Sequence, residues 1–197
     1  MIVFLGDSIT QWWDNTIFAK YFLSLDPLNF GMAGHTTRDT LTFLEKNNFH
    51  NLKPAVIILL IGTNNTDHDY TSVETFREIK KITELLLELS PESKIMIISI
   101  LPRGESPTDP KRVMNNEVNK LLVSDKFCSQ IYFLDIANLF LKADGKISSR
   151  IMYDKLHLTP HGYMLLSEAV YGFLKIMFEP EQATRPATGE ATSPNAE

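Results

Sequence analysis

Short apolar segments alternate with longer amphipathic segments along most of this chain, and this alternation constrains its fold more than any other feature. The apolar, β-rich runs are Ile2–Leu5, Leu28–Phe30, Val56–Ile61, Lys94–Ile100 and Ile131–Leu134. Unbroken hydrophobicity is typical of strands that are covered on both faces, and therefore of a parallel sheet. Segments with helical periodicity lie at about residues 16–24, 38–46, 72–89, 111–125 and 161–177. The pattern predicts an α/β fold with an open, doubly wound sheet of five parallel strands.

The chain of 197 residues is long enough for one domain with a full core. We assign that domain to residues 1–178. Residues 179–197 are rich in Pro, Ala, Thr and Glu and have no periodicity, so we expect a disordered C-terminal tail. The tail holds four Glu and one Arg, a net −3, which leaves −2 of the total −5 for the domain. This balance argues against a nucleic-acid partner, which would need a basic surface.

Cysteine content and hydropathy suggest the compartment. The single cysteine, Cys128, excludes an internal disulfide framework and a multi-cysteine zinc site. The first apolar run is short and has no basic leader, so we expect no secretory signal. The longest later run, Ala55–Ile61, is far below the roughly 20 residues that cross a bilayer. We expect a cytoplasmic protein without a membrane span.

Four polar clusters fall at one edge of the expected sheet. Gly6-Asp7-Ser8 follows the first strand, Gly31–Gly34 the second, and Gly62–Asn65 the third, while Asp154–His157 precedes the last helix. Ligands of open α/β sheets bind outside the carboxyl ends of the strands. We therefore expect a functional site at this edge.

Ser8, His157 and Asp154 are the candidate reactive residues. A serine hydroxyl becomes a good nucleophile when a histidine takes its proton and a carboxylate orients that histidine. His157 is preceded by a carboxylate three residues earlier, whereas nearby His161 is expected in the first turn of the last helix. The alternative for Ser8 is that it only caps the next helix. The Gly-x-Ser-x-Gly elbow of ordinary α/β-hydrolases is absent.

Hydrogen-bond donors for an oxyanion are also present by type. The N–H groups of Ser8 and Gly34 and the side-chain amide of Asn64 could supply them. The alternatives are a plain turn at Gly34 and a side chain of Asn64 that stabilises its own loop. His35, Asp39, His157 and His161 lack the close spacing of a metal site, and no phosphate-binding loop occurs. We expect no metal and no cofactor.

These motifs, taken in order, resemble the four blocks of the SGNH (GDSL) hydrolases over residues 1–178. The segments Asn29–Arg38, Ile61–Asn65, Leu101–Glu105 and Leu156–Thr159 look similar to the catalytic subunits of intracellular platelet-activating-factor acetylhydrolase and to bacterial relatives. The resemblance implies a three-layer, flavodoxin-like α/β fold and a serine esterase that needs no metal or cofactor and forms a homodimer. His35 departs from the close relatives, which usually carry Asp after the oxyanion-hole glycine.

The same resemblance implies a role for each residue. Ser8 would be the nucleophile, His157 the general base and then acid, and Asp154 its orienting carboxylate. Gly34 and Asn64 would join the Ser8 N–H in the oxyanion hole, and Asp7 would stabilise the turn. We expect hydrolysis of a small-molecule ester with a short acyl group, favouring acetyl. The alternatives are an O-acyltransferase that moves acetyl onto a sugar, and a non-catalytic binding subunit.

Overall fold

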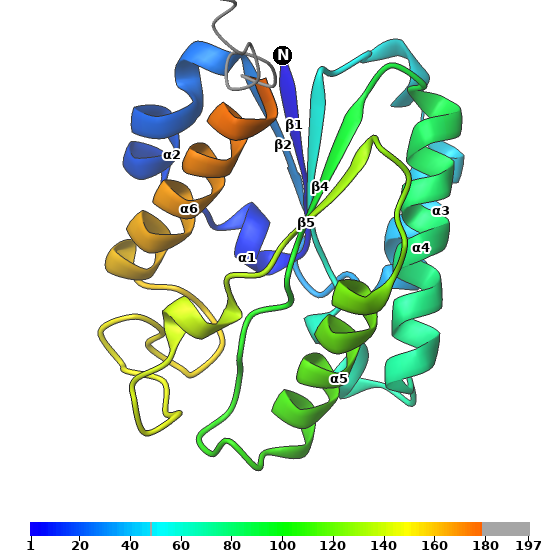
Figure 1. Cartoon of the computed structure of the whole chain (residues 1–197). Helices are drawn as coiled ribbons and strands as arrows, with labels where there is room; N and C mark the ends of the chain where they lie inside the picture. The colour runs from blue at the N-terminus through cyan, green and yellow to red at the C-terminus, as the bar shows by residue number, and fades with distance from the viewer. Residues whose placement is uncertain (48, 179–197) are drawn as a thin grey trace, which may run out of the picture.

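A five-stranded, all-parallel sheet forms the centre of the molecule (Figure 1). The computed structural model describes residues 1–47 and 49–178. The strands are β1 (Ile2–Gly6), β2 (Pro27–Gly31), β3 (Val56–Leu60), β4 (Lys94–Ile98) and β5 (Ile131–Leu134). Their order is β2-β1-β3-β4-β5, so the chain leaves β1 toward one edge and returns on its other side. The expected sheet of five parallel strands is confirmed.

Helices cover both faces of the sheet and make the fold three-layered (Figure 1). They are α1 (Ser8–Gln11), α2 (Asn15–Phe22), α3 (Thr37–Lys46), α4 (Ser72–Leu89), α5 (Pro110–Ser124) and α6 (Pro160–Phe178). One core lies between the sheet and α2 and α6, and it contains many aromatic rings around Phe4. The other core is largely aliphatic and lies between the sheet and α3, α4 and α5. Alternate residues of β1 and β3 belong to opposite cores, as strand geometry requires.

The five expected helices are present, and their ends differ by at most two residues from the sequence-based ranges. β3 and β4 end at Leu60 and Ile98, one and two residues earlier than the apolar runs suggest. The short helix α1 was not predicted. The expected disordered tail, residues 179–197, lies outside the described residues, as does residue 48.

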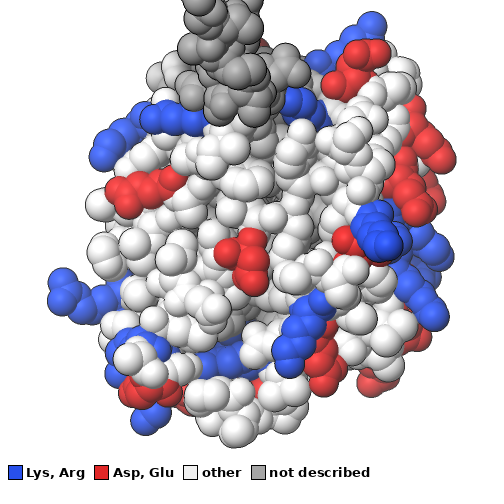
Figure 2. Space-filling view, in the orientation of Figure 1, with Lys and Arg blue, Asp and Glu red and all other residues white. Residues whose placement is uncertain are grey.

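The surface shows no dominant charge on the face that Figure 2 presents. Positive and negative side chains are interspersed around its rim, and the centre of the face is mostly uncharged. In the part of the chain that the structure describes, no helix has the length and apolar character needed to cross a membrane.

Candidate active site

The first polar turn lies where the sheet topology reverses. β1 pairs with β2 on one side and with β3 on the other, and the chain continues from these strands in opposite directions. Such a reversal separates the loops at the carboxyl ends of the strands and leaves room for a ligand. Ser8, Gly34 and Asn64 follow β1, β2 and β3 in turn. The expected convergence of polar loops at one sheet edge is therefore present.

Asp7, and not Ser8, caps helix α1. The Asp7 carboxylate accepts the backbone N–H of Ile9 at 2.9 Å, which leaves the Ser8 hydroxyl free for another partner. Asp7 is only 1% exposed. Burial raises the pKa of its carboxyl from the ordinary 3.8 to about 7, although the hydrogen bond from Ile9 opposes this shift. The interpretation of Ser8 as a simple helix cap is thus not the arrangement found.

The Ser8 hydroxyl contacts the histidine from the other end of the chain. Ser8 Oγ lies 3.0 Å from His157 Nε2, and His157 Nδ1 lies 2.6 Å from Asp154 Oδ2. An ionised Asp154 accepts the Nδ1 proton, so Nε2 carries the lone pair that faces Ser8. The three side chains form one continuous hydrogen-bonded chain. These hydrogen bonds allow His157 to take the proton from the Ser8 hydroxyl as the serine oxygen forms a bond to carbon.

Asp154, the carboxylate of this hydrogen-bonded series, lies in a tight turn. Asp154 Oδ1 accepts the backbone N–H of His157 at 2.7 Å and of Leu156 at 3.0 Å. Lys155, between Asp154 and Leu156, adopts φ +65°, a left-handed conformation that residues other than Gly rarely take. Partial burial of Asp154 disfavours its charge, but the hydrogen bonds from His157 and Leu156 outweigh this and lower its pKa. Asp154 is therefore ionised at neutral pH.

Contacts between distant segments fix the Asp154–His157 turn against the serine turn. The Tyr163 hydroxyl in α6 donates to the Ile9 carbonyl at 2.9 Å, which joins the helix after His157 to the helix of Ser8. Gly104 N–H donates to the Lys155 carbonyl at 2.9 Å, so the loop after β4 supports the turn from the other side. These contacts explain how residues separated by about 150 positions meet.

The loop after β2 is attached to both neighbouring loops. The Ala33 N–H donates to Gln11 Oε1 at 2.8 Å, and Asn64 Nδ2 donates to the His35 carbonyl at 2.9 Å. Gly34 has φ +79°, which only glycine adopts without strain. Within residues 1–47 and 49–178, the N–H groups of Ser8 and Gly34 have no hydrogen-bond acceptor. One proton of the Asn64 amide is also uncommitted, because an amide nitrogen carries two.

The remaining candidates from the sequence are placed differently. His161 lies in the first turn of α6 and is exposed, as expected. His35 takes part through its backbone carbonyl, while its ring is half-buried. Asp39 belongs to the capping box of α3 with Thr36. No group of three or more His, Cys, Asp or Glu side chains in the described residues is arranged to hold a metal ion.

Two aromatic residues beside His157 were missed in the sequence. The Trp12 ring lies 4.7 Å from the imidazole between centroids, and the Tyr153 ring lies stacked at 6.1 Å. Both are exposed, at 50% and 59%, so they form apolar walls that remain open to a ligand. The sequence offers one hint for Tyr153, which directly precedes Asp154. It offers none for Trp12, because Trp12 and His157 are far apart in the chain.

Comparisons with known proteins show which family the chain resembles. The sequence model of the GDSL-like lipase/acylhydrolase family matches residues 4–165. Platelet-activating factor acetylhydrolase IB subunit alpha2 of Rattus norvegicus is 38% identical over 180 residues, which cover 90% of this chain and 77% of that protein. Subunit alpha1 of the same organism is 33% identical over 183 residues, covering 92% and 78%.

A solved structure shows the same fold. A GDSL-like lipase of Bacteroides thetaiotaomicron superimposes with a TM-score of 0.77 over 89% of this chain and 88% of that one, at 21% identity. The chain thus belongs to the GDSL-like lipase/acylhydrolase family and is a carboxylic ester hydrolase.

Proposed function

We propose that this enzyme is a serine esterase that cleaves short-chain esters, above all acetyl esters, through an acyl-enzyme on Ser8. The observation that carries the proposal is the hydrogen-bonded chain from Ser8 Oγ through His157 to Asp154. A buried serine, 5% exposed, has no structural need for an imidazole 149 residues away. Activation of its oxygen gives that contact a purpose.

The proposed reaction has two symmetrical halves. Ser8 Oγ attacks the ester carbonyl while His157 Nε2 takes its proton, and the resulting imidazolium is stabilised by Asp154. His157 then gives the proton to the departing alkoxide, which leaves the acyl group on Ser8. Water attacks this acyl-enzyme, with His157 again taking and returning one proton, and releases the carboxylic acid.

The proposed oxyanion hole consists of the Ser8 N–H, the Gly34 N–H and the Asn64 amide. Each lies just beyond the carboxyl end of one of the neighbouring strands β1, β2 and β3, and the contacts of Ala33 and Asn64 described above support their common placement. Loss of one such donor typically costs on the order of 10²–10³ in rate.

The acetyl preference draws on the relatives. Both curated relatives above are named acetylhydrolases, and their printed substrate is platelet-activating factor. We therefore extend the proposal to acetyl esters of lipid alcohols as well as small alcohols. Trp12 and Tyr153 supply exposed apolar surface beside His157 for the alcohol part.

A chain-length series of p-nitrophenyl esters tests this function with wild type and Ser8→Ala. We expect the highest kcat/KM with acetate, a steady fall with longer acyl chains, and no burst or turnover in Ser8→Ala. Turnover that survives in Ser8→Ala would refute the nucleophile, and a maximum at long chains would refute the acetyl preference. Adding sugar acceptors to the same assay detects acyl transfer, and a chelator control detects metal dependence.

We also propose the assembly and location expected from the sequence. This chain is proposed to form a homodimer and to act in the cytoplasm; that the curated relatives are named as subunits supports assembly of more than one chain. Residues 1–178 are proposed to be the hydrolase domain. Light scattering coupled to size-exclusion chromatography would give the mass in solution, and a monomer at micromolar concentration would refute the homodimer.

A further inference from the structure

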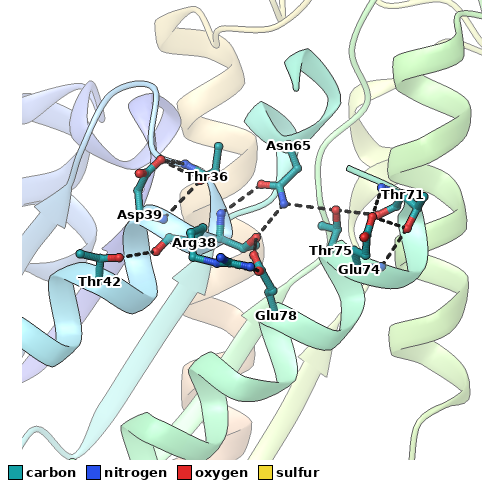
Figure 3. Close-up of polar contacts among 10 residues, drawn as sticks. Thr36, Arg38, Asp39, Thr42, Asn65, Thr71, Glu74, Thr75 and Glu78 are labelled. Carbon is teal, nitrogen blue, oxygen red and sulfur yellow. Dashed lines mark hydrogen bonds and ion pairs between the residues drawn. The ribbon is translucent and has the colours of Figure 1, made fainter. Parts of the chain in front are cut away.

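A buried polar network connects the loop after β2 with the loop after β3 (Figure 3). Asn65 is at its centre and is 0% exposed. Asn65 Oδ1 accepts the Thr37 N–H at 3.0 Å, and Nδ2 donates to Thr37 Oγ1 at 2.6 Å and to Thr75 Oγ1 at 3.2 Å. The side chain of Asn65 thus holds the first residue of α3 at two points and α4 at a third.

Glu78 determines which atoms of this network donate hydrogen bonds and which accept them. The Thr37 hydroxyl donates to Glu78 Oε2 at 2.6 Å, because an ionised carboxylate can only accept. Thr37 Oγ1 therefore receives the Asn65 amide proton on a lone pair. Arg38 Nε donates to the other oxygen of Glu78 at 2.9 Å. No member can rotate without leaving a buried polar atom unpaired, so the network is rigid.

The two loops that this network joins carry two of the proposed oxyanion donors. Thr37 lies three residues after Gly34, and Asn65 directly follows Asn64. The Asn64 amide also donates to the His35 carbonyl, which adds a second bridge between the same loops. Two bridges between two short segments fix their separation and their relative rotation. One bridge alone would leave a hinge.

We propose that Thr37, Asn65 and Glu78 are positioning residues that set the distance between the Gly34 N–H and the Asn64 amide. The inference rests on the proposed function, because it assumes that these donors bind the oxyanion. Helix stability alone does not account for the network: α3 and α4 begin with their own capping boxes, Thr36–Asp39 and Thr71–Glu74. A misplacement of about 1 Å in such a site can cost on the order of 100-fold in rate.

Thr37→Val and Thr40→Val form a matched pair for the test. Both threonines are 0% exposed and lie in α3, and both lose one hydroxyl group. The Thr40 hydroxyl donates only to the Thr36 carbonyl within its own turn, at 3.1 Å, whereas that of Thr37 reaches Asn65 and Glu78. Thr37→Ser keeps the bridging hydroxyl, and Asn65→Asp keeps the shape but replaces the donor with an acceptor.

The measurements are kcat and KM for p-nitrophenyl acetate, with melting temperatures for every variant. We expect Thr37→Val and Asn65→Asp to lower kcat by about 10- to 100-fold with KM changed less than about threefold. Thr37→Ser should restore most of kcat. Thr40→Val should lower the melting temperature while leaving kcat at the wild-type value.

The outcomes separate this inference from the proposed function. Equal kcat in Thr37→Val and Thr40→Val, or a Thr37→Ser variant as impaired as Thr37→Val, would overturn the positioning role even if Ser8→Ala is inactive. An active Ser8→Ala variant would overturn the proposed function and this inference with it. If Thr37→Val does not fold, Asn65→Asp and Thr37→Ser decide the question by the same kcat criterion.

Discussion

Replacing Asp7 with Asn separates the structural role of this side chain from the cost of burying its charge. Asp7 is 1% exposed, and its carboxyl has a pKa of about 7 in the folded protein against an ordinary 3.8. Asn keeps the oxygen that accepts the Ile9 N–H, so helix α1 stays capped. Only the ionisation disappears.

The size of the effect follows from the two pKa values. Between them, the folded protein holds a proton that the unfolded chain has already lost, so the free energy of unfolding falls as pH rises and becomes level above about pH 7. Each pKa unit corresponds to about 1.36 kcal/mol. Between about pH 5 and the folded-state pKa of about 7 lie roughly two pH units. Over this range the free energy of unfolding of the wild type should fall by on the order of 3 kcal/mol through Asp7 alone.

Urea unfolding of wild type and Asp7→Asn in the same buffers, from about pH 5 to pH 8, measures this difference because other titrating groups cancel. We expect the free energy of unfolding of Asp7→Asn to increase relative to that of the wild type as pH rises, and this increase to stop near pH 7. Asp7→Ala should show the same pH trend with a constant loss of about 1 kcal/mol from the missing cap. A difference that is independent of pH, or that favours the wild type at high pH, would refute the reasoning.

Three further predictions concern the residues that shape the site. Asp154→Asn removes the acceptor that orients His157 and should lower kcat by about 10²- to 10⁴-fold with little change in KM, as steady-state kinetics would show. Lys155→Val forces a β-branched residue into φ +65° and should cost about 1–3 kcal/mol in urea unfolding, whereas Lys155→Gly should be tolerated. Arg112 is 1% exposed and donates to the carbonyls of Arg103, Gly104 and Gly145. Arg112→Met leaves these acceptors unpaired, so it should cost about 3 kcal/mol or more, and an unchanged melting temperature would contradict this role.

The strands could be predicted because burial on both faces leaves a continuous apolar signal. The same signal explains why their ends were misplaced. The run that contains β4 continues to Ile100, which is 2% exposed although the strand ends at Ile98. Conversely, Gly6 and Gly31 have no apolar character but are paired in the sheet. Hydrophobicity reports burial, whereas a strand is defined by its hydrogen bonds.

The motifs of the site could be predicted because they are local and follow strands in a fixed order. Helix α1 has only four residues, which is too short for a periodic pattern, and Asp7 as its cap was the one available signal. Trp12 and the Asn65–Thr37–Glu78 network depend on contacts between segments far apart in the chain. No spacing in the sequence encodes such contacts.

The central claim, that Ser8 is the nucleophile activated by His157, is tested most directly by covalent labelling. A fluorophosphonate should modify the wild-type enzyme once, and mass spectrometry of its peptides should place the adduct on Ser8. His157→Ala should slow the labelling by about 100-fold or more, because the hydroxyl loses its base. An adduct on another residue, or ester hydrolysis that continues in fully labelled enzyme, would contradict the account.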